Sequence, residues 1–393
     1  MKDENHWIST KSQEIPPFLV MDVLERAMEM ASNGEDIIHL EVGEPDFDTP
    51  ANIVQAGVQA MQTGKTHYTP STGIPELRRA VAKHYRSTYG VAVDPDCVVI
   101  TSGSSPAIFL VVSALLNPGD EIILSDPHYA CYPNFIRFLG GVPVFVEAAW
   151  QEGFQINPED VEKAVTEKTR GILINSPSNP TGAVMEADRM KRLAQFNIPV
   201  ISDEIYHGLV YEGKEHSILE FTPNAFVVNG FSKLYAMTGW RLGYLIAPPQ
   251  YVRPLQKMAQ NFFISPSDFV QYAGVEALSN SSQETRHMKE IFNQRRLSMI
   301  PKLKEIGFGI KVDPTAAFYI LADARHFSDD SYRFAFDILE EAGVGVAPGI
   351  DFGSNAEGFI RFSYTNSLEN IQAGLDRIDL YLKKRFGVRG SRT

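Results

Sequence analysis

Asn229-Gly-Phe-Ser-Lys-Leu-Tyr235 places an amine just after a short β-branched segment, and Gly239-Trp-Arg-Leu-Gly243 adds a guanidinium a few residues later. Upstream, Ser202-Asp-Glu-Ile-Tyr206 supplies a carboxylate and a phenol, and Asn179-Pro-Thr-Gly182 supplies an amide. These groups occur along a chain in which helical and strand patterns alternate. Such alternation predicts an α/β fold, and the recurring polar groups predict a functional site on it.

Seven short runs of β-branched and apolar residues alternate with helical patterns between about residues 50 and 250. They predict strands buried on both faces of a mainly parallel seven-stranded sheet, with helices as the crossovers that flank it. Ligands of such sheets collect at the carboxyl ends of the strands. The runs are Cys97–Thr101, Glu121–Ser125, Val142–Val146, Gly171–Asn175, Pro199–Ser202, Phe226–Asn229 and Leu242–Ile246.

The pattern changes after about residue 295, where helical segments surround a few short apolar runs. This change indicates a smaller α+β domain, as expected for a chain of 393 residues that exceeds one usual core. We predict a large ligand-binding domain over residues 49–295 and a small domain formed by both chain ends, residues 1–48 and 296–393. Helices are expected near residues 18–33 and 367–385.

Composition narrows the possible functions. The formal net charge of -12 and the pI near 5.3 argue against a general nucleic-acid binder, whose affinity depends on neutralising phosphates. With only two cysteines and a polar N-terminus without an apolar leader, a reducing cytoplasm is expected. No apolar run reaches the roughly 18 residues of a membrane span, so no membrane association is expected. No metal site is predicted.

Lys233 is the predicted catalytic residue. A neutral amine attacks an aldehyde, so a lysine in this role needs a lowered pKa, which its mostly uncharged neighbours allow. Asp203 follows a predicted strand and is expected to pair with a protonated ring nitrogen. Tyr206, one turn further on if that segment is helical, and Asn179 are expected to bond a phenolate oxygen. Taken singly, most lysines are solvated, and an aspartate after a strand is often a helix N-cap.

A phosphate site is predicted at Thr101-Ser-Gly-Ser-Ser-Pro-Ala107, which follows a strand and opens an apolar helix. Pro106 fits the first helical position and Ser105 the N-cap. The free amides and the helix dipole at such an end attract anions. A well-capped structural helix without a ligand is the alternative. The predicted phosphate ligands are Ser104, Ser105, Ser232 and Arg241.

Two further side chains complete the predicted site. Tyr129 follows a predicted strand and is expected to stack on a flat ring, although a half-buried core tyrosine is the commoner case. Arg361 lies in the apolar run Phe359-Ile-Arg-Phe-Ser363, where a buried guanidinium needs an anion. A substrate carboxylate is the expected bidentate partner, and an internal salt bridge is the alternative.

One cofactor, pyridoxal 5'-phosphate, suits the whole set. Its aldehyde condenses with a lysine, its pyridine nitrogen pairs with an acid, and its phosphate needs several donors. The sequence therefore predicts a pyridoxal-phosphate enzyme with Lys233 at its centre.

Jointly, these motifs make the chain resemble the class I/II aminotransferases of the aspartate aminotransferase superfamily, the fold type I pyridoxal-phosphate enzymes. The likeness extends over almost the whole chain. Each motif is weak alone, and the combination is highly specific. The matching stretches are Leu40–Phe47, Tyr68–Arg78, Ser176–Gly182, Asp203–Tyr206, Ser232–Arg241 and Arg361–Tyr364.

The resemblance implies a homodimer with shared active sites. Tyr68 would reach the cofactor phosphate of the neighbouring subunit, and Gly43 would lie near the substrate carboxylate. Ile15-Pro-Pro-Phe18 would cover the site, so Ile15 is also expected to contact the substrate. Residues near Ile15, Phe18, Tyr132 and Tyr319 are expected to form the side-chain pocket. Some aspartate-specific relatives carry a lysine on the helix after the phosphate loop, and none stands at residues 107–116 here, which favours a broader or more apolar substrate range.

The leading hypothesis is transamination from an L-amino acid to a 2-oxo acid, with 2-oxoglutarate as the expected acceptor and ping-pong kinetics. Lys233 would remove the Cα proton of the substrate and return it to the cofactor. A β- or γ-elimination enzyme of the carbon–sulfur lyase type is the alternative. A ligand-sensing regulator on the same fold is a third possibility, which the acidic chain and the roughly forty residues before Gly43 disfavour.

Overall fold

A computed structural model describes residues 7–387, in which a seven-stranded sheet spans the larger part of the chain. The strand order is β2-β8-β7-β6-β5-β3-β4. β8 is antiparallel to both of its neighbours, and the other adjacent pairs are parallel. All seven predicted strands are present, so the predicted sheet is confirmed. Their bounds are β2 Val98–Thr101, β3 Glu121–Asp126, β4 Val142–Glu147, β5 Thr169–Asn175, β6 Val200–Asp203, β7 Ala225–Gly230 and β8 Gly243–Ile246.

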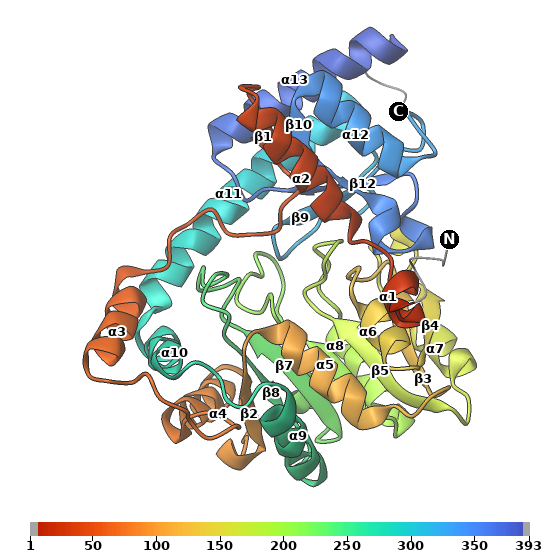
Figure 1. The fold of residues 1–393 in the computed structure, drawn as a ribbon. Helices are drawn as coiled ribbons and strands as arrows, with labels where there is room; N and C mark the ends of the chain where they lie inside the picture. Colours follow the sequence, from red (N-terminus) through yellow and green to blue (C-terminus); the bar gives the residue numbers. More distant parts are fainter. Residues whose placement is uncertain (1–6, 388–393) are drawn as a thin grey trace.

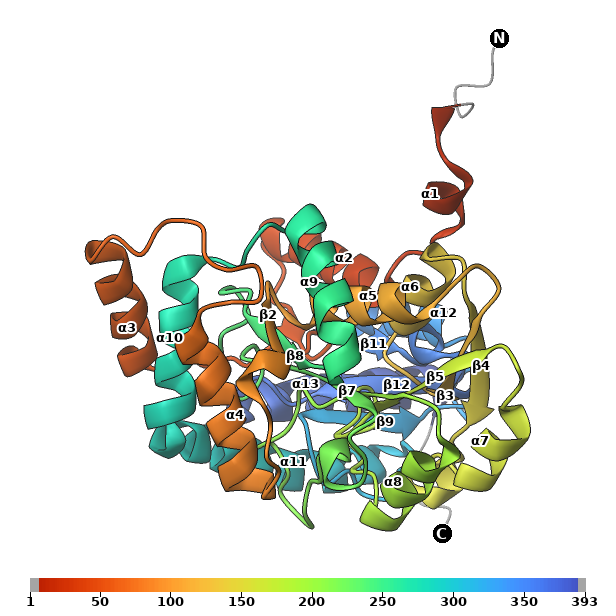
Figure 2. The same cartoon turned by 90° about the horizontal axis from the view of Figure 1, so that it is seen from below.

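Successive strand residues point into two different apolar layers, one on each face of the sheet. Val99 belongs to an apolar cluster with residues of α5, α6 and α9, whereas its neighbour Val98 belongs to another cluster with residues of α4, α7, α8 and α10. Figure 2 shows α5 and α9 on one side of the sheet and α7 and α8 on the other. Burial on both faces explains why β2, β6, β7 and β8 read as continuous apolar runs, whereas β4 at the edge of the sheet leaves Val142 and Phe145 exposed. The helices are α3 Ala51–Gln62, α4 Pro75–Tyr89, α5 Ser104–Leu115, α6 Tyr132–Phe138, α7 Pro158–Ala164, α8 Ala187–Leu193, α9 Pro249–Phe262 and α10 Asp268–Asn280.

A smaller unit is built from both ends of the chain. β9 (Tyr319–Asp323), β12 (Phe359–Ser363) and β11 (Ala347–Pro348) form an antiparallel sheet, and β1 (Ile38–His39) pairs in parallel with β10 (Val344–Gly345). Figure 1 shows the N-terminal helix α2 lying against α12 from the other end of the sequence. The helices of this unit are α2 Leu19–Ser32, α11 Ser282–Ile306, α12 Ser331–Ala342 and α13 Leu368–Phe386.

The predicted domain boundary falls inside a helix. Residue 295 lies in the middle of α11, which continues from the side of α10 into the core of the small unit, where Met299 and Leu303 are buried. The division at residue 295 therefore stays a prediction, and residues 1–6 and 388–393 of the predicted small domain lie outside the described residues. The helices predicted near 18–33 and 367–385 correspond to α2 and α13.

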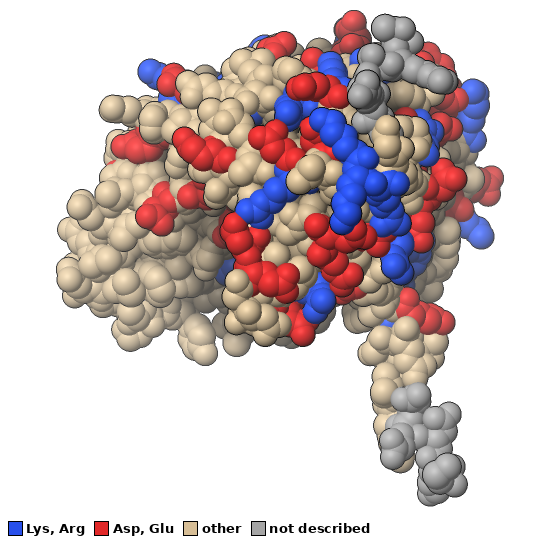
Figure 3. Space-filling model, turned by 90° about the horizontal axis from the view of Figure 1, so that it is seen from above, with Lys and Arg blue, Asp and Glu red and all other residues tan. Residues whose placement is uncertain are grey.

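Charged side chains are distributed unevenly over the surface. In Figure 3, Lys and Arg side chains intermingle with Asp and Glu over much of the view, whereas the left side, where α3 and α10 lie, carries few charges. No helix within residues 7–387 is long and apolar enough to cross a membrane. Over the same range, no cluster of three or more His, Cys, Asp or Glu side chains is arranged to hold a metal ion.

Candidate active site

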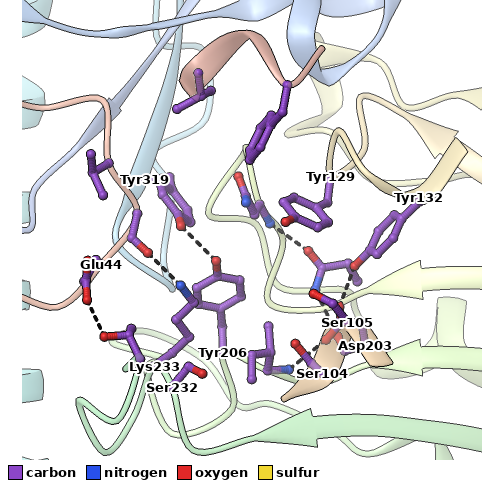
Figure 4. Close-up of a pocket in the computed structure, with 18 of the residues that line it drawn as sticks. Glu44, Ser104, Ser105, Tyr129, Tyr132, Asp203, Tyr206, Ser232, Lys233 and Tyr319 are labelled. Atoms are coloured by element: carbon purple, nitrogen blue, oxygen red, sulfur yellow. Dashed lines mark hydrogen bonds between the residues drawn. The ribbon is translucent and has the colours of Figure 1, made fainter. Parts of the chain in front are cut away.

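A cavity of about 320 Å³ lies where the carboxyl ends of several sheet strands meet the small unit (Figure 4). Asn175 and Asp203 end β5 and β6 and line it from the sheet, while Tyr319 and Arg361 line it from β9 and β12. We call this cavity the cleft. The predicted site residues that line it are Gly43, Ser104, Ser105, Tyr129, Asn179, Asp203, Tyr206, Ser232, Lys233, Arg241 and Arg361.

The amine of Lys233 points into the cleft. Its Nζ donates a hydrogen bond to the backbone oxygen of Gly43 at 2.7 Å and lies 6.0 Å from the ring centre of Tyr206 (Figure 4). Burial lowers the pKa of this lysine to about 8, an effect that the nearby carboxylate of Glu44 partly opposes. A lysine with a lowered pKa is neutral more of the time at physiological pH, which is the condition for attack on a carbonyl carbon.

The carboxylate of Asp203 lies deep in the cleft at the end of β6. Its Oδ2 accepts a hydrogen bond from the hydroxyl of Tyr132 at 2.7 Å, and its Oδ1 accepts one from the backbone N–H of Ile205 at 3.1 Å. Burial raises the pKa of Asp203 to about 6, against the lowering effect of these two hydrogen bonds. A cation placed against this carboxylate would favour its ionised form, so the site suits a protonated ring nitrogen.

The predicted phosphate site is a free helix N-terminus with an arginine beside it. α5 begins at Ser104 and its N-cap is Gly103, so the prediction of Ser105 as N-cap and Pro106 as first helical residue is wrong by two residues. Gly103 has a φ of +106°, and a Cβ there would lie 2.6 Å from Nη2 of Arg241. Since no side chain of the described residues caps the helix, its first amides remain available to an anion.

Arg361 is a buried guanidinium with one unused donor. Only 2% of its surface is exposed, and its Nη1 donates to Oδ1 of Asn179 at 2.9 Å. Its Nη2 donates to the backbone oxygen of Glu41, and its Nε has no hydrogen-bond partner within residues 7–387. Among the described residues it forms no salt bridge with Asp or Glu, so the alternative of an internal ion pair is not what the structure shows. A buried guanidinium with a free donor suits a bound carboxylate.

Aromatic side chains form much of the remaining wall. The Tyr206 hydroxyl lies 2.8 Å from that of Tyr319, and Tyr206 stands in a turn rather than the helix that its spacing from Asp203 allowed. A Cβ on Gly43 would lie only 1.9 Å from the Tyr319 hydroxyl, so this position requires glycine. The ring of Tyr129 lines the cleft, as its predicted stacking role needs.

Two predicted site residues do not line the cleft. Ile15 is 48% exposed and lines a separate cavity of about 80 Å³ beside Lys11 and Phe138, and its contact with substrate stays a prediction. Phe18, three residues later, reaches the cleft instead. Tyr68 is 83% exposed and lies outside the cleft of its own chain. Its role at a neighbouring subunit stays a prediction.

The structure also brings in groups to which sequence reasoning gave no such part. Tyr132 and Tyr319 were expected in the side-chain pocket, but their hydroxyls bond to Asp203 and Tyr206. Glu44 lines the cleft and accepts a hydrogen bond from Thr238. The available signal for Glu44 was its place in the Leu40–Phe47 motif, directly after Gly43.

Comparisons with known proteins agree with this geometry. Residues 35–378 match the family described as aminotransferase class I and II. The chain is 42% identical over 382 residues to the (5-formylfuran-3-yl)methyl phosphate transaminase of Methanocaldococcus jannaschii, covering 96% of this chain and 100% of that one. It is 38% identical to the aspartate/prephenate aminotransferase of Thermus thermophilus, covering 94% and 97%. The structure of the Thermus thermophilus aspartate aminotransferase with maleate matches with a TM-score of 0.92, covering 95% and 99% of the two chains.

The chain therefore belongs to the class I and II aminotransferases, which are fold type I enzymes. The protein is a transaminase, and this outcome confirms the enzyme class, the family and the fold expected from the sequence.

Proposed function

We propose that the protein moves an amino group from an L-amino acid to a 2-oxo acid, with pyridoxal 5'-phosphate as cofactor and 2-oxoglutarate as acceptor. The observation that carries the proposal is the half-buried lysine Lys233 in one cleft with the buried carboxylate of Asp203 and the guanidinium of Arg361, whose Nε has no hydrogen-bond partner among the described residues. When bound, this cofactor supplies an aldehyde that captures amines and a ring that accepts the electrons released at the substrate Cα.

The chain's own residues then orient the reactants and move one proton. Lys233 would hold the cofactor through its aldehyde, and its free amine would then move the proton that leaves the substrate Cα. Asp203 holds the proton on the ring nitrogen. Arg361 and Asn179 hold the substrate α-carboxylate, while Tyr206 and Asn179 bond the phenolic oxygen. The phosphate is held by Ser104, Ser105, Ser232 and Arg241.

The open side of the cleft supports donors with apolar side chains. Phe18, Met21 and Leu24 reach it from α2 and the residue before it, and Ile108 reaches it from α5. Among the described residues, the cations that line the cleft are Lys233, Arg241 and Arg361, and each has a proposed role other than binding a side-chain carboxylate. The distal carboxylate of 2-oxoglutarate would therefore lie toward the solvated mouth of the cleft.

A panel of amino donors tests this function. The purified enzyme, loaded with pyridoxal phosphate, is mixed with one L-amino acid at a time, and the cofactor absorbance is followed before and after 2-oxoglutarate is added. We expect apolar and aromatic donors to change the spectrum alone and 2-oxoglutarate to restore it, because each half-reaction proceeds separately. Release of pyruvate and ammonia from cysteine conjugates without amino transfer would overturn the proposal in favour of elimination.

We also propose a homodimer with shared active sites. Large apolar side chains are exposed on α3, on the side of Figure 3 that carries few charges, and at the C-terminal end of α9 and directly after it. They are Val54, Val58, Met61, Phe262, Phe263 and Ile264.

Mixing two inactive variants tests the shared site. Lys233→Ala and Tyr68→Ala subunits, unfolded and refolded together, would regain activity that neither has alone if Tyr68 serves the partner's cleft. Absence of any recovery, although co-purification of differently tagged subunits shows mixed dimers, would contradict the sharing.

A further inference from the structure

The carboxylate of Asp203 has one side-chain hydrogen-bond donor among the described residues, and that donor is Tyr132 (Figure 4). The hydroxyl lies 2.7 Å from Oδ2, and Tyr132 and Asp203 are 2% and 4% exposed. The only other recorded donor to the carboxylate within residues 7–387 is the backbone N–H of Ile205. Since charge-assisted hydrogen bonds are the strong ones, this contact matters most when Asp203 is ionised.

We propose that Tyr132 is a positioning residue that fixes the orientation of the Asp203 carboxylate and keeps it ionised beside the cofactor's ring nitrogen. The inference rests on the proposed function, because it acts through a group of the proposed cofactor. Tyr132 itself touches no reacting atom.

The position of Tyr132 in the fold couples it to the cofactor in a second way. It is the first residue of α6, and its N–H donates to the backbone oxygen of Tyr129 at 3.1 Å. The rings of Tyr129 and Tyr132 meet edge to face, with centres 5.3 Å apart. One short segment thus carries both the residue expected to stack on the cofactor ring and the residue that holds the acid opposite the ring nitrogen.

The balance of effects on Asp203 shows why the hydroxyl matters. Burial raises the pKa of Asp203, and the hydrogen bond from Tyr132 is the largest effect that opposes burial. Lys233 also faces this carboxylate and favours its ionised form, and Tyr129 is the other titratable group near it. Loss of the hydroxyl would leave Oδ2 without its recorded donor, which disfavours the ionised carboxylate and so the protonated ring nitrogen.

Binding of two cofactors to the apo-protein tests the inference. One is pyridoxal phosphate, and the other is its analogue with C–H in place of the ring nitrogen. We expect Tyr132→Phe to weaken binding of pyridoxal phosphate about tenfold or more, as for loss of a hydrogen bond to a charged group, and to leave binding of the analogue nearly unchanged. The absorbance of the loaded variant should also titrate at a shifted pH.

Tyr85→Phe is the matched control. Glu204 directly follows Asp203 in the chain, and its buried carboxyl group accepts a hydrogen bond from the hydroxyl of Tyr85 at 2.9 Å, but Tyr85 does not line the cleft. Tyr85→Phe removes the same hydroxyl group from an equally buried tyrosine. Its effect on cofactor affinity therefore measures the general cost of removing a buried hydroxyl. We expect it to leave the ratio of the two cofactor affinities unchanged.

The outcomes separate this inference from the proposed function. Wild-type apo-protein that fails to bind pyridoxal phosphate would overturn both. Wild-type binding, with equal weakening of both cofactors in Tyr132→Phe, would overturn only the inference and assign Tyr132 to packing. In an Asp203→Asn background, Tyr132→Phe should cost no further affinity, and full additivity would also overturn the inference.

A variant of nearly the same shape covers the case in which Tyr132→Phe does not fold. Fluorotyrosine incorporated at position 132 keeps the ring and makes the hydroxyl a stronger donor. We expect it to shift the affinity ratio in the opposite direction, toward pyridoxal phosphate, and an unchanged ratio in the folded protein would overturn the inference.

Discussion

Lys233 combines two requirements that conflict in water. Its amine must be neutral to attack a carbonyl carbon, and it must also be held in place. Burial supplies the first by lowering the pKa to about 8, and the 2.7 Å hydrogen bond to the Gly43 oxygen supplies the second. Because the acceptor is a backbone oxygen and not a carboxylate, the hydrogen bond orients the amine without adding a full negative charge.

The first prediction concerns this amine. Lys233→Ala should lower kcat for amino transfer by at least about 10³-fold, since general acid–base catalysis alone contributes up to about 10⁴-fold. The measurement is steady-state turnover with an apolar donor and 2-oxoglutarate. Lys163→Ala, which removes an exposed lysine paired with Asp160, is the control and should keep full activity. Sustained turnover near the wild-type rate would refute the role of Lys233.

The second prediction concerns the guanidinium group of Arg361. Arg361→Lys keeps the positive charge but loses the planar set of donors, so KM for the amino acid should rise about tenfold or more while kcat changes less. Arg325→Lys is the control, because Arg325 also lies over two aromatic rings, those of Trp150 and Phe359, but outside the cleft. An unchanged KM in Arg361→Lys would show that the substrate carboxylate binds elsewhere.

At the scale of elements, the position of the N-terminus of α5 depends on the close approach of its backbone to the backbone of β8. A Cβ on Gly243 in β8 would lie 2.6 Å from the carbonyl carbon of Gly103 and 2.8 Å from the nitrogen of Ser104. β8 therefore presses directly on the start of the helix. Arg241 lies in the turn directly before β8 and donates to the backbone oxygen of Thr238. The contact between β8 and α5 therefore fixes where the first amides of α5 lie relative to Arg241.

The third prediction separates this geometry from ordinary backbone strain. Gly103→Ala and Gly119→Ala both place an alanine at positive φ, +106° and +85°, and each should cost about 1–2 kcal/mol of unfolding free energy in urea titrations. Only at Gly103 would the new Cβ meet Arg241, while nothing lies within 4 Å of one at Gly119. Gly103→Ala should therefore also weaken pyridoxal-phosphate binding. Equal cofactor affinities in the two variants would contradict the phosphate site.

The elements show what a sequence can and cannot predict here. The central strands of the sheet were predictable because burial on both faces leaves continuous β-branched runs. The start of α5 was not, because Gly103 is favoured there by the close approach of Arg241 and β8, which are distant in sequence. Lys233, Asp203 and Arg361 were found through motif and residue chemistry. The link between Tyr132 and Asp203 was not, since no local pattern records which hydroxyl meets which carboxylate.

At the scale of the whole molecule, the buried acid Glu204 makes the unfolding free energy depend on pH. Glu204 is 0% exposed, and its Oε1 accepts from the hydroxyl of Ser217 at 2.9 Å and the N–H of Ile218 at 3.1 Å. Burial raises its pKa from 4.5 to about 8, against these hydrogen bonds. The folded protein therefore holds this proton more tightly than the unfolded chain. The contribution of this proton to the unfolding free energy is complete below pH 4.5 and is lost as the pH rises to about 8.

The fourth prediction follows from this loss of stability with rising pH. Between pH 6.5 and 8, the unfolding free energy of the apo-protein should fall with rising pH, by at most about 1.4 kcal/mol per pH unit from Glu204. His207, with its pKa lowered to about 3 by burial, acts in the opposite direction only below 6.5. The lowered pKa of Lys233 adds stability mainly above pH 8. Urea titrations at a series of pH values provide the measurement.

A matched pair of variants completes that test. Glu204→Gln should flatten the fall between pH 6.5 and 8, whereas Glu159→Gln, an exposed acid paired with Arg192, should leave the slope unchanged. An equally steep fall in Glu204→Gln would assign the pH dependence to another group.

The pairing of β1 with β10 has a consequence for how this protein is made. Ile38 aligns with Val344, so nearly the whole chain must leave the ribosome before the first strand finds its neighbour. Until then the face of α2 that carries Val23 and Ala27, which are fully buried in the finished protein, lacks its partner Leu339 on α12. Nascent chains stalled before residue 344 should thus expose the apolar face of α2, which makes them prone to aggregate and dependent on a chaperone. This should hold even after the seven-stranded sheet has formed.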